Sequence, residues 1–155
     1  MIDPVHVSAR GDYAVRAALG LAARHPRTTS AQSLSEEQDL PYKFLEAILA
    51  DLRRAGVVRS HRGVDGGYVL TREPAQVTVG EILRAVDGPL AGVRGSRPED
   101  VAYEGAAEHL QEVWVAVRSA VRRVVDEVSL ADVLKGRLPA HVRRLTAVPD
   151  AWEPR

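Results

Sequence analysis

Basic side chains gather in one part of an otherwise neutral sequence. The chain of 155 residues carries 21 Lys and Arg and 21 Asp and Glu. Between residues 41 and 72 the basic residues are Lys43, Arg53, Arg54, Arg59, Arg62 and Arg72, and the acidic ones are Glu46, Asp51 and Asp65. The net charge is therefore +3 in this segment and −3 elsewhere. A local basic surface suits backbone phosphates, although scattered solvated charges would give the same count.

Glycines at positions 63, 66 and 67 interrupt this segment and admit two interpretations. A glycine-rich loop can hold a nucleotide phosphate, but such a loop ends in Gly-Lys-Ser or Gly-Lys-Thr before a helix. Here Gly67 is followed by Tyr68 and by strand-forming residues. The sequence therefore favours a β-hairpin, with strands over residues 57–62 and 68–71.

Two helices are predicted before residue 40. Ser8 is a suitable N-cap for the first, which ends before His25-Pro26. A short second helix follows over residues 30–38, with Ser30 or Ser33 as its N-cap.

A third helix is predicted from Pro41 to Gly56, with Pro41 in the first helical position. Its predicted apolar stripe consists of Phe44, Leu45, Ile48, Leu49 and Leu52. Lys43 and Glu46 fall on the exposed face near its start. Two short helices joined by a turn, followed by a hairpin or wing, match a winged helix-turn-helix.

The longest periodic segment lies in the second half of the chain, after a helix over residues 78–86 that Thr78 and Glu81 would cap as a box. A helix is predicted over residues 107–127. Its apolar residues recur at alternating spacings of four and three, as in a coiled-coil seam, and are Leu110, Trp114, Val117, Val121, Val124 and Val128. A second copy of the chain is the simplest cover for this stripe. Packing on the chain's own first helix is the alternative.

These elements predict a mainly α fold with a small β-hairpin, divided into four parts. We expect a winged helix-turn-helix DNA-binding domain over residues 1–88 and a connecting loop over residues 89–106. Residues 107–135 would hold the dimerisation helix and a short helix capped by Ser129 and Asp132, and residues 136–155 a C-terminal tail. No apolar run approaches the roughly 20 residues of a membrane span, so we expect a cytoplasmic protein.

Several motifs in this order resemble the Rrf2 family of bacterial winged-helix transcription regulators. The resemblance centres on LPYKFLEAILADLRRAGVVRSHRGVDGGYVLTR and includes the wing signature Arg62-Gly63 followed by Gly66-Gly67-Tyr68. It extends to SARGDYAVRAALGLAA, ILRAVDG and VSLADVL, and so covers roughly residues 8–134. It implies a homodimer on double-stranded DNA whose long helices cross, with each third helix in a major groove and each wing in the neighbouring minor groove. We expect this dimer to act as a repressor on a palindromic operator.

The resemblance also implies roles for individual residues. Glu46 falls where the family has a base-contacting glutamate, Arg62 where it has a minor-groove arginine, and Lys43 where it often has a serine. Their chemistry agrees, because a carboxylate can accept a hydrogen bond from cytosine and a guanidinium suits a narrow minor groove. The remaining candidate DNA-binding residues are Tyr42, Arg53, Arg54, Arg59, Gly66 and Gly67. Each of the three arginines could equally be a solvated charge, and Tyr42 could simply pack against the turn.

The best known members of the family hold an iron-sulfur cluster with three cysteines before the long helix, but this sequence has no cysteine. We therefore expect no cofactor and no metal, and an unidentified small molecule or protein as the signal. His109 with Glu104, Glu108 and Glu112 could form a metal site, but a solvated acidic face is the favoured interpretation.

Two other functions are considered. A winged-helix module that binds proteins, without sequence-specific DNA binding, is the alternative that zero net charge favours. An enzyme is not expected, because the sequence has no nucleophile arrangement, nucleotide loop or paired carboxylates in a recognisable pattern.

Overall fold

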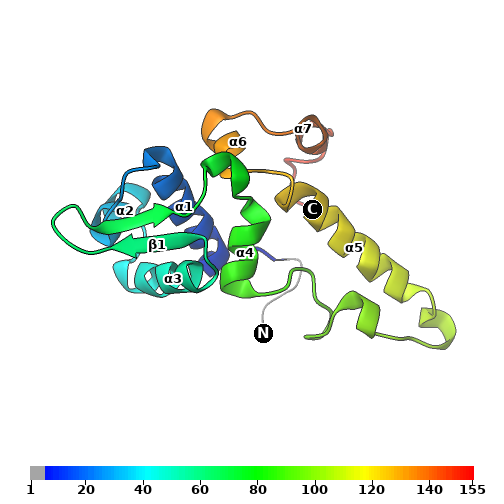
Figure 1. The fold of residues 1–155 in the computed structure, drawn as a ribbon. Helices are drawn as coiled ribbons and strands as arrows, with labels where there is room; N and C mark the ends of the chain where they lie inside the picture. The colour runs from blue at the N-terminus through cyan, green and yellow to red at the C-terminus, as the bar shows by residue number, and fades with distance from the viewer. Residues whose placement is uncertain (1–5) are drawn as a thin grey trace.

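The computed structural model describes residues 6–155 and confirms the mainly helical fold with one hairpin (Figure 1). The helices are α1 (Ala9–Arg24), α2 (Ala31–Gln38), α3 (Tyr42–Arg54), α4 (Val79–Asp87), α5 (Leu110–Val125), α6 (Leu130–Lys135) and α7 (Ala140–Thr146). Strands β1 (Val58–His61) and β2 (Gly67–Leu70) pair antiparallel. Short 3-10 turns are η1 (Pro74–Gln76), η2 (Pro98–Asp100) and η3 (Gly105–Ala107). No helix of this described part is both long and apolar enough to cross a membrane.

Side-chain caps fix the starts of four helices. The N–H of Gly11 donates to Ser8 Oγ at 2.9 Å at the start of α1, and Ser30 rather than Ser33 caps α2. Thr78 caps α4, although Glu81 pairs with Arg72 instead of completing a box. The reciprocal capping box at α6 forms as expected from the sequence. Each cap accepts a hydrogen bond from a backbone N–H that would otherwise have no helical partner.

Helix α1 lies at the centre of the core. Its residues Ala14, Ala17, Ala18 and Leu21 have no exposed surface, and it contacts α2, α3, α4, α6 and β2. Small side chains let the neighbours approach closely: a Cβ on Gly20 would lie 2.7 Å from Leu34 of α2. The elements packed around α1 form what we call the winged-helix unit, which comprises α1 to α4, the hairpin and α6.

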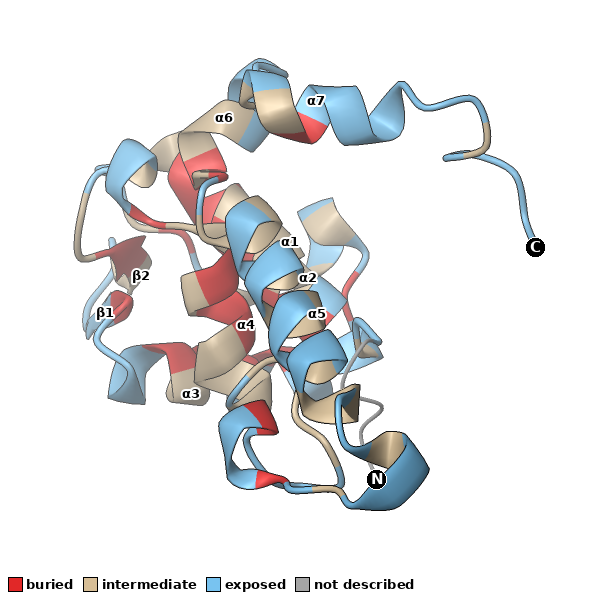
Figure 2. Cartoon of the chain, turned by 90° about the vertical axis from the view of Figure 1, so that its right-hand side faces the viewer, coloured by how far each residue is buried: buried red, intermediate tan, exposed pale blue. Residues whose placement is uncertain are grey.

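Helix α5 is shorter than expected and projects from the winged-helix unit (Figure 1). Figure 2 shows exposed and half-buried residues along it. The predicted helix over residues 107–127 is wrong at its start, because residues 105–107 form η3, with φ of +63° at Gly105. The helix therefore begins at Leu110. None of its 16 residues is fully buried.

Helix α6 returns to the winged-helix unit. The N–H of Leu130 donates to Val77 O at 2.9 Å, and that of Val79 donates to Val128 O at the same distance. Val128, expected on the dimer seam, lies beyond α5 and is only 5% exposed because its own chain covers it. The segment expected to be a tail contains α7, in which Val142 is buried.

Replacing Leu130 with alanine tests how strongly α6 holds to the unit. Leu130 is 0% exposed, so Leu130→Ala should lower the free energy of unfolding by about 2–5 kcal/mol through lost burial and a residual cavity. Leu134→Ala, at a side chain 45% exposed, is the control and should change it by less than about 0.5 kcal/mol. Urea unfolding measures both, and equal losses would contradict the packing.

Candidate nucleic-acid interface

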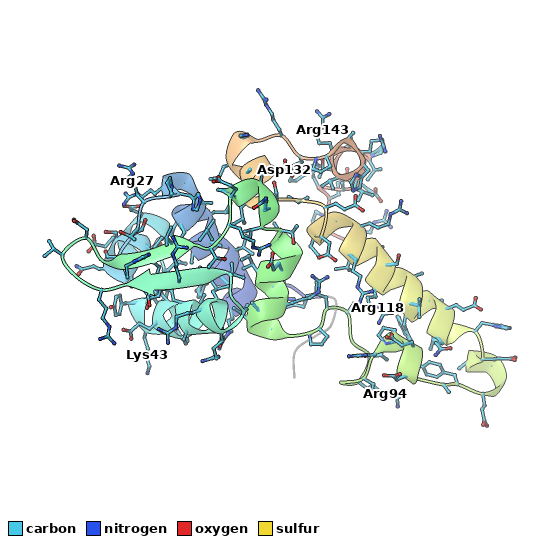
Figure 3. All side chains as sticks on the ribbon, in the orientation of Figure 1. Arg27, Lys43, Arg94, Arg118, Asp132 and Arg143 are labelled. Carbon is cyan, nitrogen blue, oxygen red and sulfur yellow. The ribbon has the colours of Figure 1, made fainter. Side chains whose placement is uncertain are left out.

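Helix α3 presents two different faces. Leu45, Ile48, Leu49 and Leu52 are buried against the core, as the stripe predicted. Three of the expected DNA-binding residues are exposed in the first two turns, namely Tyr42, Lys43 and Glu46. Lys43 projects away from the body of the molecule (Figure 3). This half of α3 is available to a partner.

The assignment of Phe44 to the buried stripe is wrong. Its side chain is 60% exposed, because it precedes Leu45 by about 100° around the helix axis and lies at the stripe's edge. Its ring leans on Tyr13 of α1, with 6.5 Å between ring centroids. Phe44 thus adds an apolar group to the exposed start of α3, and Pro41 is the N-cap of α3 rather than its first residue.

The two arginines at the end of α3 differ in their surroundings. Arg54 and Arg10 both pair with the carboxylate of Asp51, which ties the start of α1 to α3. Arg53 is exposed and forms no ion pair with any residue from 6 to 155. Arg53 therefore offers a full charge to a partner, whereas part of the Arg54 charge is already compensated.

The hairpin carries the other cations. On β1, Arg59 and His61 share one face, and Arg59 Nε donates to His61 Nε2 at 3.2 Å. Arg62 follows at the start of the exposed hairpin tip. The hairpin projects on the side of the winged-helix unit opposite α5, beside α3 (Figure 1). The start of α3 and the wing can therefore face one partner together.

Two threonines that the sequence analysis did not single out hold the wing in place. Thr29 and Tyr68 exchange backbone hydrogen bonds at 2.8 and 2.9 Å, and Thr28 Oγ1 donates to Asp65 O at 2.7 Å. A Cβ on Gly67, whose φ is +149°, would lie 2.5 Å from Thr29 O. A single isolated bridge leaves no periodic signal in sequence. Gly67 therefore permits this close approach of the two backbones. The hairpin also confirms that the glycines do not form a phosphate-binding loop before a helix.

Ion pairs within the structure leave fewer cations of the basic segment available to a partner. Arg72 pairs with Glu81 of α4 and donates to Gln76 O, so it holds the hairpin to α4. The cations of residues 41–72 that form no ion pair within the described chain are Lys43, Arg53, Arg59 and Arg62. All four are exposed on α3 or the wing. Glu46 stands among them as an acceptor.

Comparison with known proteins agrees with this geometry. Residues 7–136 match the model of the family described as Rrf2, iron-dependent transcriptional regulator. The chain is 42% identical over 142 residues to Rv1287 of Mycobacterium tuberculosis, named as an HTH-type regulator, covering 91% of this chain and 88% of that protein. It is 35% identical over 128 residues to the regulator CymR of Bacillus subtilis, covering 82% of this chain and 88% of CymR.

Solved structures give the same result. The structure of CymR, titled the global cysteine regulator of B. subtilis, superposes with a TM-score of 0.72 at 33% identity and covers 88% of this chain and 98% of that one. IscR of T. potens gives a TM-score of 0.69 at 35% identity, with coverage of 84% and 87%.

The family description names iron, but the residues present here do not fit an iron-sulfur cluster. The chain has no cysteine, and residues 6–155 contain no cluster of three His, Cys, Asp or Glu side chains that could hold a metal. Glu104 and Glu108 lie before α5, so they do not share a helix face with Glu112. With the helix-turn-helix, the wing and matches over most of its length, the chain belongs to the Rrf2 family of DNA-binding HTH transcriptional regulators.

Proposed function

We propose that this regulator acts as a homodimeric repressor on a palindromic operator. Each copy would insert the start of α3 into a major groove and its wing into the neighbouring minor groove. The observation that carries this proposal is the set of four uncompensated cations on α3 and the adjacent wing, with Glu46 among them. Such an arrangement supplies both phosphate anchors and a base-selecting group.

The side chains divide into selecting and anchoring groups. Glu46 only accepts hydrogen bonds, so it suits the amino group of cytosine and repels phosphate. Arg62 would enter the minor groove, where a narrow groove concentrates negative potential. Tyr42, Lys43, Arg53 and Arg59 would contact phosphates or base edges near these two, and Arg54 would contribute less because Asp51 holds it. Gly66 and Gly67 shape the wing that carries Arg62.

The exposed surface of α5 supports the homodimer. Its apolar stripe of Leu110, Trp114, Val117, Val121 and Val124 is only half buried, and Val113 beside it is 51% exposed. The chain's own η2 and α4 provide part of the cover, and Trp114 Nε1 donates to Tyr103 Oη at 3.0 Å. A second α5 would cover the rest and place two α3 helices about a two-fold axis.

Removal of the Arg62 guanidinium should weaken DNA binding. DNA selected from a random pool provides the operator, and fluorescence anisotropy measures affinity for it. Arg62→Ala should bind about 10- to 100-fold more weakly, because a groove contact and its counterion release are both lost. Arg143→Ala on α7 is the matched control and should bind as the parent does. Unchanged affinity for Arg62→Ala would rule out its groove role.

Removal of the Glu46 carboxylate should change selectivity more than affinity. Glu46→Ala should lose roughly tenfold or more of its preference for the selected operator over random duplex, because the acceptor for one base is gone and a charge repelled by phosphate is gone too. Competition binding with random duplex measures this, with Glu153→Ala as control. If the parent itself shows no preference over random DNA at physiological salt, the protein-binding module becomes the better hypothesis.

A negative charge on α5 should separate the two copies. Val113→Glu introduces a carboxylate at a side chain already half exposed in the single chain, so the fold should survive while the apolar contact between copies is lost. Sedimentation at micromolar concentration should give a monomer, with helical content unchanged by circular dichroism. Val148→Glu, at a side chain exposed near the C-terminus, should remain dimeric. A monomeric parent would contradict the dimer.

A further inference from the structure

A cavity of about 870 Å³ lies between the winged-helix unit and α5. It is lined by the end of α4, by the loop over residues 88–99 and by one face of α5. This volume is within the range of about 300–1,000 Å³ typical of sites for small molecules. The cavity is separate from the exposed start of α3: Figure 3 shows Arg94 and Arg118 on the α5 side, away from Lys43.

The lining of this cavity is strongly basic. Its five guanidinium groups belong to Arg84, Arg94, Arg97, Arg118 and Arg122. Only two carboxylates, those of Asp87 and Glu99, line the cavity with them. Three positive charges are therefore in excess, in a chain whose formal net charge is zero.

Two of the five arginines have carboxylate partners and three keep an available charge. Arg84 donates to Asp126, the C-cap of α5, at 2.5 Å, and Arg118 pairs with Glu99. Within residues 6–155, no ion pair forms at the other three, which are Arg94, Arg97 and Arg122. The pKa of Glu99 lies below its ordinary value because its own backbone N–H donates to the carboxylate and because Arg118 and Arg97 lie nearby. The single negative charge of Glu99 therefore does not balance the positive charges of the arginines around it.

The loop holds its arginines in a defined turn. Val93 and Ser96 exchange backbone hydrogen bonds at 2.9 Å. Arg94, which lies between them, has a φ of +51°, a value that residues other than glycine seldom adopt. Gln111 Nε2 of α5 donates to Glu99 O at 3.0 Å and fixes the end of the loop. The backbone of the turn therefore fixes the position from which the Arg94 side chain extends.

We propose that this cavity binds a small anion with two or more negative charges, a phosphorylated or polycarboxylate compound, as the effector of the regulator. Guanidinium groups bind phosphate and carboxylate oxygens through paired N–H donors, and three uncompensated ones call for more than one negative charge. The cavity and its lining alone support the proposed binding site, whereas its role as an effector site rests on the proposed function.

The connection to DNA binding runs through Arg84. This side chain lines the cavity and also joins α4 to α5 through Asp126. An anion beside Arg84 competes with Asp126 for the same guanidinium. Asp87, also in the lining, accepts a hydrogen bond from Ser8 Oγ at the start of α1 at 2.6 Å. Binding therefore acts on the contacts that set the winged-helix unit against α5, and with them the spacing of two α3 helices in the dimer.

Calorimetry of the full chain without DNA tests the site. Inorganic pyrophosphate and citrate are titrated separately at constant ionic strength. We expect saturable binding of one anion per chain by at least one probe; pyrophosphate alone would indicate a phosphorylated ligand and citrate alone a polycarboxylate. Arg94→Gln and Arg122→Gln should each weaken binding about tenfold or more, because each loses charge-assisted hydrogen bonds. Arg143→Gln on α7 should bind as the parent does.

Two results would overturn the site. Neither probe binds saturably, or both cavity variants bind like the parent, which would place the anion outside this cavity. Operator affinity with and without saturating anion then tests the effector role, with an expected change of about tenfold. Arg94→Gln should lose that response and Arg143→Gln should keep it. An anion that binds without changing operator affinity overturns the effector role. A parent that binds no operator contradicts the proposed function and leaves the calorimetric result intact.

Discussion

The close packing around α1 is the constraint on which the rest of the molecule depends. One face of this helix carries only alanine and glycine at its tightest points, and Leu21 fills the remaining space. Four helices and a strand therefore pack around it at short distances. A Cβ on Gly11 would lie 2.9 Å from the carboxylate of Asp87 of α4, so that side chain would have to move. Because α1 contacts both α3 and β2, it sets where the third helix and the wing lie relative to one another.

This packing divides the chain between a rigid unit and an extended arm. Caps, the α1 core and the Thr29–Tyr68 bridge fix α3 and the wing relative to one another, so their exposed side chains form one surface. Helix α5 has no fully buried residue and joins the unit through α4, with Arg84 and Asp126 at the junction. A rigid surface suits the recognition of a duplex of fixed geometry. A helix with few buried contacts, such as α5, suits the assembly of two copies and the adjustment of that assembly by a ligand.

The sequence predicted what local rules control and missed what distant segments create. Ser8, Ser129 and Gly66 act within a few residues, and the structure confirms the two caps and the turn between the strands. The prediction that Phe44 is buried is wrong because this residue lies at the edge of the apolar stripe, about 100° before Leu45 around the helix axis. The start of α5 was misplaced because the apolar pattern continues past a turn at Gly105. Thr29, and the arginines of the cavity from α4, the loop and α5, come together only in the folded chain.

In the proposed complex, two copies of the chain bind one operator through α3 and the wing. Methylation protection by dimethyl sulfate tests it most directly, because the reagent attacks guanine N7 in the major groove and adenine N3 in the minor groove. On DNA selected by the protein, we expect two protected major-groove patches related by a two-fold axis and about one helical turn or a multiple apart, with protected adenines beside each. A single unpaired patch, or no protected base in either groove, would contradict it.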